Sequence, residues 1–227
     1  DYYHKRTDPL IATIKMPSSM GVTSRRANIG VQVDQGLNGS ISYAFLYKPK
    51  KSINYTMSLN FRYGKAYYDK IGQNLDQYNK ENIAKNMVRY YDGSSPTALW
   101  AVRSRGIDPA TGKEIFVRKD DVLTYEFSYN DEVEIGDTRP TLEGVWGNML
   151  YYKGFSASLQ IRYSFGADAF NSTLYNKVEN ISSGSITSNQ DKRALYDRWK
   201  KPGDKAKFKS ISLFDYTPMS SRFVMKE

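Results

Sequence analysis

Two stretches of the chain, residues 53–64 and 154–165, alternate regularly between apolar and polar side chains. The apolar positions of the first stretch are Ile53, Tyr55, Met57, Leu59, Phe61 and Tyr63. Those of the second are Phe155, Ala157, Leu159, Ile161, Tyr163 and Phe165. Because successive side chains of a strand point to opposite faces, each stretch is predicted to be a β-strand with one apolar and one polar face. We expect Phe155, Leu159 and Ile161 to share a face, opposite Gln160 and Arg162.

The length of these two strands favours a membrane protein. Strands of soluble proteins run about five or six residues, whereas a tilted strand that crosses a bilayer needs roughly nine to eleven. Partial alternation extends the pattern over residues 10–16, 37–48, 122–129, 141–152 and 207–214. The predicted fold class is therefore all-β, a serial antiparallel array of strands, and a membrane barrel is favoured over a soluble sandwich.

The connections between the predicted strands fall into two lengths. Two connections are short and indicate hairpins, at residues 49–51 and 153–154. Two others are too long for hairpin turns, at residues 65–98 and 167–202. Alternation of short turns with long loops is typical of outer-membrane barrels. A helical turn or two is predicted within residues 74–86.

Composition is compatible with a membrane barrel and excludes some other classes. The 19 tyrosines and an aromatic content of 14% suit the headgroup zone of a membrane. A tyrosine-rich soluble β-protein remains the alternative. The chain has no cysteine, so a disulfide or a thiolate metal site is excluded. The net charge of +9 is spread along the chain rather than massed on one helix, which argues against nucleic-acid binding.

No segment carries an enzymatic or cofactor motif. Residues 106–114, GIDPATGKE, have five residues between the glycines and Glu114 where a phosphate-binding loop needs Ser or Thr, so a tight turn between two strands is predicted. His4 is the only histidine and lies near the start of the chain, on a predicted edge. Carboxylates such as Asp120, Asp121, Asp131, Glu132 and Glu134 show no spacing that singles out a catalytic pair or an EF-hand. We predict no enzyme, no cofactor and no metal.

Three residues are candidates for contacts in the loops, namely Trp100, Arg103 and Trp199. Trp146 lies inside a predicted strand and is expected to serve packing or a membrane interface. The sequence does not assign any of these residues to a substrate site.

Several segments in succession resemble the carboxy-terminal barrel portion of the SusC/RagA family of TonB-linked outer-membrane proteins of Bacteroidetes-type bacteria. They are DYYHKRTDPLI at the start, ANIG at 27–30, GIDPATG at 106–112, IGDTRPTLEG at 135–144, YYKGFSASLQIRYSFG at 151–166, RWKKPGD at 198–204 and SSRFVMKE at 220–227. Each motif is weak alone, but the order and spacing of the motifs agree with the family over nearly the whole chain.

The resemblance implies a 22-stranded barrel closed around a plug, which imports glycans, oligosaccharides or peptides across the bacterial outer membrane with energy from TonB. It also implies a SusD-like surface lipoprotein as partner. The sequence departs from the family by showing neither a plug domain nor a TonB-contacting segment. Residues 1–227 are therefore expected to be a partial barrel domain. The competing hypotheses are a soluble extracellular β-domain that binds carbohydrate through aromatic residues and, less favoured, a hydrolase.

Overall fold

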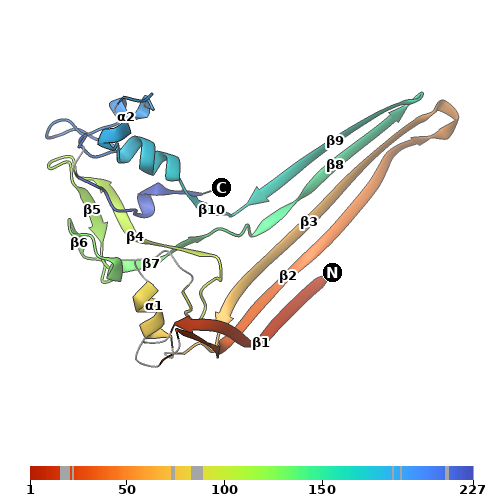
Figure 1. The fold of residues 1–227 in the computed structure, drawn as a ribbon. Coiled ribbons are helices and arrows are strands. Elements are labelled where there is room, and N and C mark those ends of the chain that lie inside the picture. The colour runs from red at the N-terminus through yellow and green to blue at the C-terminus, as the bar shows by residue number, and fades with distance from the viewer. Residues whose placement is uncertain are drawn as a thin grey trace.

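A computed structural model describes residues 1–15, 21, 23–72, 75–82, 89–185, 187–189, 191–212 and 215–226. The chain forms a long antiparallel sheet, which we call the wall, and a more irregular unit at one end of it (Figure 1). The wall has the strand order β1-β2-β3-β8-β9. Its strands are β1 (Tyr2–Lys15), β2 (Ser24–Lys48), β3 (Ile53–Asp69), β8 (Leu142–Tyr152) and β9 (Phe155–Phe165).

The two short connections lie together at one end of the wall. A single helical turn, η2 (Pro49–Lys51), joins β2 to β3, and Lys153 and Gly154 join β8 to β9. Both Lys153 and Gly154 have positive φ, at 45° and 91°, as a tight two-residue hairpin requires. The amide of Lys153 donates to the carbonyl of Ser52 over 2.8 Å, which links the two hairpin ends. Both predicted short turns are confirmed.

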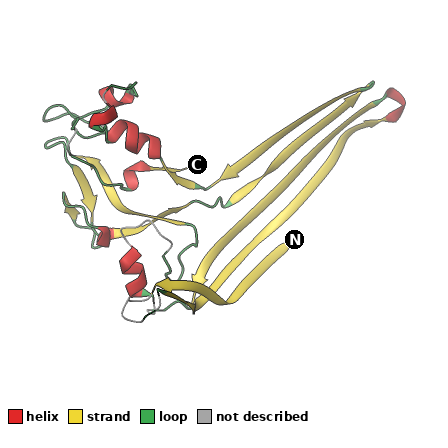
Figure 2. Ribbon diagram, viewed as in Figure 1, coloured by secondary structure: helices red, strands yellow, loops and turns green. Residues whose placement is uncertain are grey.

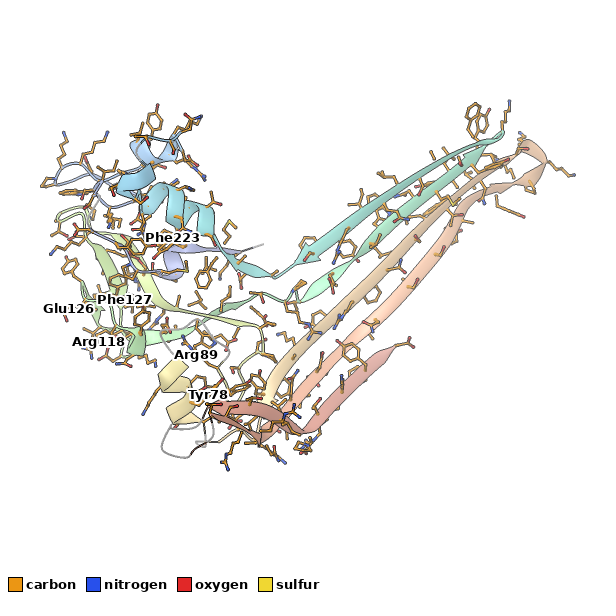
Figure 3. The ribbon with its side chains drawn as sticks, in the orientation of Figure 1. Tyr78, Arg89, Arg118, Glu126, Phe127 and Phe223 are labelled. Carbon is orange, nitrogen blue, oxygen red and sulfur yellow. The ribbon has the colours of Figure 1, made fainter. Side chains whose placement is uncertain are left out.

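The register of the wall places apolar side chains on one face and polar side chains on the other. Ile41, Leu59, Trp146 and Ile161 form one continuous row across four strands. The row beside it, on the opposite face, consists of Ser42, Ser58, Gly147 and Gln160. In the part of the chain that the structure describes, no second layer of protein covers the apolar face, and Phe155 and Leu159 stay 80% and 58% exposed. In Figure 3 side chains project from both sides of a single sheet.

Two glycines on the apolar face receive aromatic rings from the neighbouring strand. A Cβ on Gly39 would lie 2.4 Å from the ring of Phe61, and a Cβ on Gly144 would lie 2.4 Å from the Tyr163 hydroxyl. The Tyr163 hydroxyl crosses Gly144 to donate to the carbonyl of Asn60 at 3.0 Å. These positions therefore need glycine for close approach rather than for an unusual φ.

The other end of the wall carries the loop unit, which we define as the described residues of 70–140 and 166–226. Figure 2 shows its short helices and strands gathered at that end, away from the two short turns. It contains a sheet of order β6-β5-β4-β7 and a pair β10-β11. The strands are β4 (Ala98–Ile107), β5 (Glu114–Val117), β6 (Leu123–Thr124), β7 (Glu132–Asp137), β10 (Asp168–Phe170) and β11 (Val224–Lys226). The helices are α1 (Asp76–Asn82), η4 (Tyr129–Asp131), η5 (Leu174–Glu179), η6 (Ser183–Ser185), α2 (Arg193–Tyr196) and η7 (Ser221–Phe223).

Two small apolar clusters stabilise the loop unit. Val178, Ile181, Ala194 and Phe208 pack together beneath its helical turns. Ile29 and Tyr68 of the wall pack with Ile71 and Leu75, which fixes the loop unit to the ends of β2 and β3. No helix among the described residues is long and apolar enough to cross a membrane.

Most of the predicted elements are confirmed. The alternating stretches 37–48, 53–64, 141–152 and 154–165 all lie in the wall, and 10–15 lies in β1. Helix α1 confirms the helix predicted within 74–86, although residues 74 and 83–86 fall outside the described part of the chain, as does residue 16.

Two predicted strands are wrong. Of 122–129, only Leu123 and Thr124 are in a strand, because the Thr124 and Ser128 hydroxyls accept hydrogen bonds from the amides of Glu126 and Asn130 and turn the chain. Over 207–212 the backbone makes an isolated bridge between Phe208 and Arg198 rather than a strand, because the amides of Lys207 and Phe208 both bond to the Asp197 carbonyl. Residues 213 and 214 lie outside the described residues.

Candidate functional site

The polar face of the wall has two zones along its length. Near the short turns its side chains are uncharged: Asn54, Thr56, Ser58, Ser156 and Ser158 lie on either side of Met149 and Tyr151 of β8. Near the loop unit it carries the charged side chains of Asp34, Arg62, Glu143 and Arg162, which we call the charge belt together with Arg139 from the connection after β7. The zones follow from the register, because the positions on the strands alternate with the apolar rows of the other face.

Contacts connect the charge belt across the wall. Arg139, which follows β7, donates to both carboxylate oxygens of Asp34 on β2 over 3.1 and 3.2 Å. The Tyr3 hydroxyl also donates to Asp34, over 3.2 Å, and its ring lies 6.0 Å from the Arg62 guanidinium. The hydrogen bond to Asp34 raises the pKa of Arg139 above its ordinary value. The belt therefore couples the edge strand β1 to β2, to β3 and to the connection from the loop unit.

At the other side of the belt, two arginines share one carboxylate. Arg62 on β3 and Arg162 on β9 approach Glu143 on β8 at 3.7 and 3.5 Å. These three residues line an open hollow of about 400 Å³ together with Asn38, Asn60 and Val145. Phe61 and Gly144 complete the lining, so guanidinium, amide and apolar groups surround the hollow with a single carboxylate among them.

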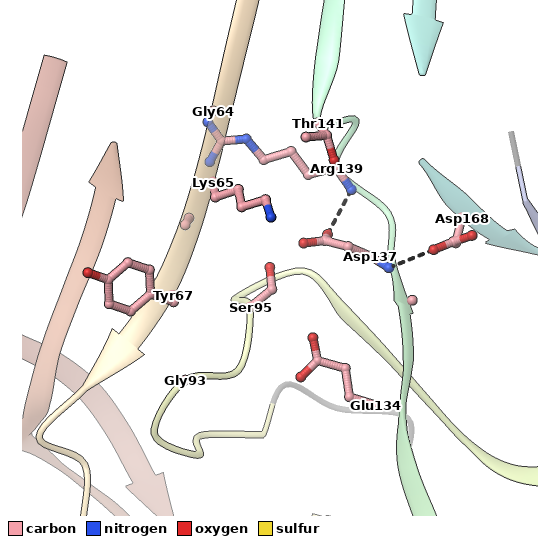
Figure 4. Close-up of a pocket in the computed structure, with 12 residues that line it drawn as sticks. Gly64, Lys65, Tyr67, Gly93, Ser95, Glu134, Asp137, Arg139, Thr141 and Asp168 are labelled. Carbon is pink, nitrogen blue, oxygen red and sulfur yellow. Dashed lines mark hydrogen bonds between the residues drawn. The ribbon is translucent and has the colours of Figure 1, made fainter. Parts of the chain in front are cut away.

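A second hollow, of about 480 Å³, lies where the wall meets the loop unit (Figure 4). Its lining includes Lys65, Glu134, Asp137, Arg139 and Asp168. Asp137 accepts from the Arg139 amide at 2.9 Å, and its own amide donates to Asp168 at 3.1 Å, as the dashed lines of Figure 4 show. Partial burial raises the pKa of Glu134, and the nearby charge of Asp137 raises it further, while the Ser95 amide lowers it. Hydrogen bonds among its own residues thus fix much of this lining.

The three candidate loop contacts all serve the loop unit itself. The ring of Trp100 packs 5.2 Å from Tyr91, and the guanidinium of Arg89 lies 5.1 Å above it. Arg103 donates to the Arg118 carbonyl at 2.8 Å and pairs with Asp121 at 2.7 Å. Neither of the two hollows is lined by Trp100, Arg103 or Trp199.

Trp199 holds the turn at residues 106–114. Its Nε1 donates to the Pro109 carbonyl at 2.9 Å, and its ring covers Gly112, where a Cβ would lie 2.5 Å away. Trp146, in contrast, lies on β8 in the apolar face of the wall, beside Leu59 and Ile161, as the sequence predicts.

The segment 106–114 is a turn between β4 and β5, as predicted. The Asp108 carboxylate accepts from the Ala110 amide at 2.9 Å and from the hydroxyls of Thr111 and Tyr125, each at 2.7 Å. These hydrogen bonds, with that of Thr111 the largest, lower the pKa of Asp108. His4 lies on the outer strand β1, where its Nδ1 is 3.3 Å from the Gln35 amide oxygen.

Sequence reasoning missed the buried ion cluster of the loop unit. Arg222 donates to Glu179 at 2.7 Å and to Glu114 at 2.9 Å, and the Ser220 hydroxyl donates to Glu114 at 2.5 Å. Both carboxylates are buried. The partners are 43 and 108 residues apart, and no local pattern links them. Among the described residues, no group of three or more His, Asp or Glu side chains is placed to hold a metal ion.

Comparison with known proteins points to one family. No protein-family model matches the chain. It is 24% identical over 262 residues to TonB-dependent receptor P39 of Formosa agariphila, a match that covers 94% of this chain and 24% of that receptor. This relative is a receptor, and the solved structures that resemble the chain are of an importer, so none of these proteins is an enzyme.

Solved structures share the fold. The RagAB peptide importer in its open-open state matches 99% of this chain with a TM-score of 0.78 and 21% identity, and the match covers 24% of that chain. A second structure, of the RagAB peptide transporter, matches with a TM-score of 0.76 and 19% identity over 99% of this chain and 24% of that one. The chain thus spans about a quarter of the length of the proteins it matches. These likenesses confirm the resemblance to the SusC/RagA family of TonB-linked proteins, whose antiparallel barrel-type fold this chain shares.

Proposed function

We propose that residues 1–227 form part of the barrel and the extracellular loops of a TonB-dependent nutrient importer in the bacterial outer membrane. The single observation that carries this proposal is the wall. Its strands β8 and β9 are each 11 residues long and have an open apolar face opposite a polar one. A strand of this length spans a bilayer, and apolar side chains without a protein layer over them suit lipid.

The ends of the wall support an orientation. Outer-membrane barrels have short turns on the periplasmic side and long loops outside the cell. The turns at 49–51 and 153–154 would then lie in the periplasm, and the loop unit would lie outside the cell. The polar face would line the lumen.

Partners and cargo follow from the family. The proposed importer is energised by TonB and works with a SusD-like surface lipoprotein, and a plug elsewhere in the protein closes the barrel. Its cargo is a glycan, an oligosaccharide or a peptide. The solved structures are of a peptide importer and a peptide transporter, so the cargo of those proteins is a peptide.

The orientation can be tested in the complete receptor. An epitope tag inserted after Gly184 in the loop unit should be detected by antibody on intact cells. The same tag inserted after Lys50 should be detected only after the outer membrane is opened. Detection of both tags, or of neither, on intact cells contradicts the orientation. If cells without TonB still take up the cargo, the proposal that TonB supplies the energy is wrong.

The second candidate is a soluble extracellular domain that binds carbohydrate. The exposed tyrosines of the loop unit favour it, since Tyr125, Tyr196 and Tyr216 stay 51%, 73% and 70% exposed. This candidate requires the 227-residue chain to be monomeric without detergent. Size-exclusion chromatography with and without detergent separates the two functions, because an apolar face of this extent should aggregate in water.

A further inference from the structure

The two arginines that share Glu143 lie at the loop end of the wall. Arg62 is nine residues from Ile53, the first residue of β3 after the short turn. At about 3.3 Å per residue this is roughly 30 Å of strand, comparable to the hydrocarbon core of a bilayer before the tilt is counted. In the orientation proposed above, the arginines therefore stand where the lumen opens towards the outside of the cell.

The arginines retain unused capacity to donate hydrogen bonds. Their distances to Glu143, 3.7 and 3.5 Å, exceed the roughly 2.7–2.9 Å of a close charge-assisted hydrogen bond. The Arg62 and Arg162 side chains are 45% and 78% exposed, whereas Glu143 is 28% exposed. A guanidinium has five N–H donors in a planar fork, so one carboxylate between two guanidinium groups leaves most of those donors free.

The charges at this place are unbalanced. The belt contains three arginines and two carboxylates, and Arg139 already holds Asp34 in a two-pronged pair. The remaining group of Arg62, Arg162 and Glu143 carries an excess of one positive charge. The hollow of about 400 Å³ beside it also offers the amides of Asn38 and Asn60.

We propose that Arg62 and Arg162 form a carboxylate-recognition site at the outer mouth of the lumen, which selects cargo that carries a free carboxylate. The site rests on the proposed import function. An incoming carboxylate would take hydrogen bonds from both guanidinium groups and compensate the excess charge, and the Asn38 and Asn60 amides would contact the atoms next to it. The uncharged side chains deeper in the wall would then let the cargo move on.

The test uses the complete receptor purified in detergent at low salt, where charges are least screened. Two matched pairs of probes separate the sources of a carboxylate. The first is N-acetyl-tetra-alanine and its C-terminal amide, and the second is trigalacturonic acid and its methyl ester. Binding is measured by calorimetry. For at least one pair we expect the carboxylate form to bind about tenfold more tightly than its neutral counterpart, the order expected for a hydrogen-bonded charge.

Variants assign that preference to the two arginines. The double variant Arg62→Gln, Arg162→Gln should reduce the preference to less than about twofold, and Arg62→Lys, Arg162→Lys should keep part of it because the charge remains. The matched control is Arg105→Gln, Arg118→Gln, which removes two exposed arginines of the loop unit and should leave the preference unchanged.

Several outcomes overturn the proposal. One is equal binding of the acidic and neutral member in both pairs, absence of binding included. Another is a preference that survives in the double glutamine variant. If that variant lowers the unfolding temperature and keeps the preference, the arginines serve an internal contact instead. A receptor that passes the tag and TonB tests but shows no preference refutes this inference alone and leaves the import function standing.

Discussion

The guanidinium of Arg139 donates to both carboxylate oxygens of Asp34, over 3.1 and 3.2 Å, and so joins the connection after β7 to the second strand of the wall. The two residues are 105 positions apart in the sequence, and each side chain is about one quarter exposed. A planar fork matched to a carboxylate fixes orientation as well as distance. The pair therefore helps to hold the loop unit against the end of the wall.

Arg139→Lys should loosen this connection, because lysine keeps the charge but loses the two-pronged geometry. We expect a local cost of about 1 kcal/mol, in the range of a partly exposed ion pair. Hydrogen exchange of the peptide that covers residues 135–142 in the complete receptor should become faster. Arg118→Lys, whose pair with Asp120 is exposed at 3.8 Å, is the control and should leave exchange unchanged. Unchanged exchange in both variants would show that the pair does not hold the connection.

Ile161→Arg should impair assembly of the receptor into the membrane, because the apolar face would place a charge against lipid. The expected cost is roughly 2 to 4 kcal/mol near the middle of the bilayer. Leu59→Arg, in the same row of the wall, should act in the same way. Heat-modifiable migration on gels measures the folded barrel.

Gln160→Arg is the matched control for this substitution, since Gln160 is the adjacent residue on the polar face of the same strand. It should assemble normally. Equal migration of the Ile161 and Gln160 variants would mean that the apolar face does not meet lipid.

Gly144→Ala should destabilise the wall by overpacking. A Cβ at this position would lie 2.0 Å from the Asn60 carbonyl oxygen and 2.4 Å from the Tyr163 hydroxyl. Overpacking typically costs about 1–3 kcal/mol. The temperature at which the complete receptor loses its heat-modifiable form should fall, whereas Gly184→Ala, with no atom within 4 Å, should leave it unchanged. A normal temperature for both variants would show that the strands adjust without loss.

Arg222→Met should unfold the carboxy-terminal part of the loop unit, because it leaves Glu114 and Glu179 buried without their common cation. Removing one partner of a buried ion pair costs roughly 3–5 kcal/mol. Limited proteolysis should reveal new cleavage between residues 171 and 226. Arg193→Met, which removes an exposed partner of Asp191, should show none. The triple variant Glu114→Gln, Glu179→Gln, Arg222→Met should recover much of the resistance, and if it does not, buried charge is not the cause of the cleavage.

The turn at residues 106–114 should weaken in acid. The folded pKa of Asp108 lies below its ordinary value of 3.8, so its contribution to stability is present above that value and is lost as the pH falls through the folded pKa. Hydrogen exchange of residues 108–114, corrected for the intrinsic rate, should show a loss of protection that grows as the pH falls below 3.8. Asp108→Asn should show no such step, and an identical step in this variant would assign the transition to another group.

Most of the wall could be predicted from the sequence. The period of two in residues 53–63 and 155–165 fixes which side chains share a face, and the turn residues Lys153 and Gly154 fix the hairpin between them. Both are local properties that neighbouring residues determine. The same local reasoning failed over 122–129, where the alternation is broken by hydrogen bonds that the Thr124 and Ser128 hydroxyls accept from the amides of Glu126 and Asn130.

The tertiary structure alone decided the positions of the charged groups. Alternation placed Arg62 and Arg162 on the polar face, but only the pairing of β3, β8 and β9 brought both to Glu143. The ion cluster around Arg222 depends on partners as far as 108 residues away. The physical reason is that periodicity and turn chemistry act within a few residues, whereas these ion pairs exist only where distant segments meet.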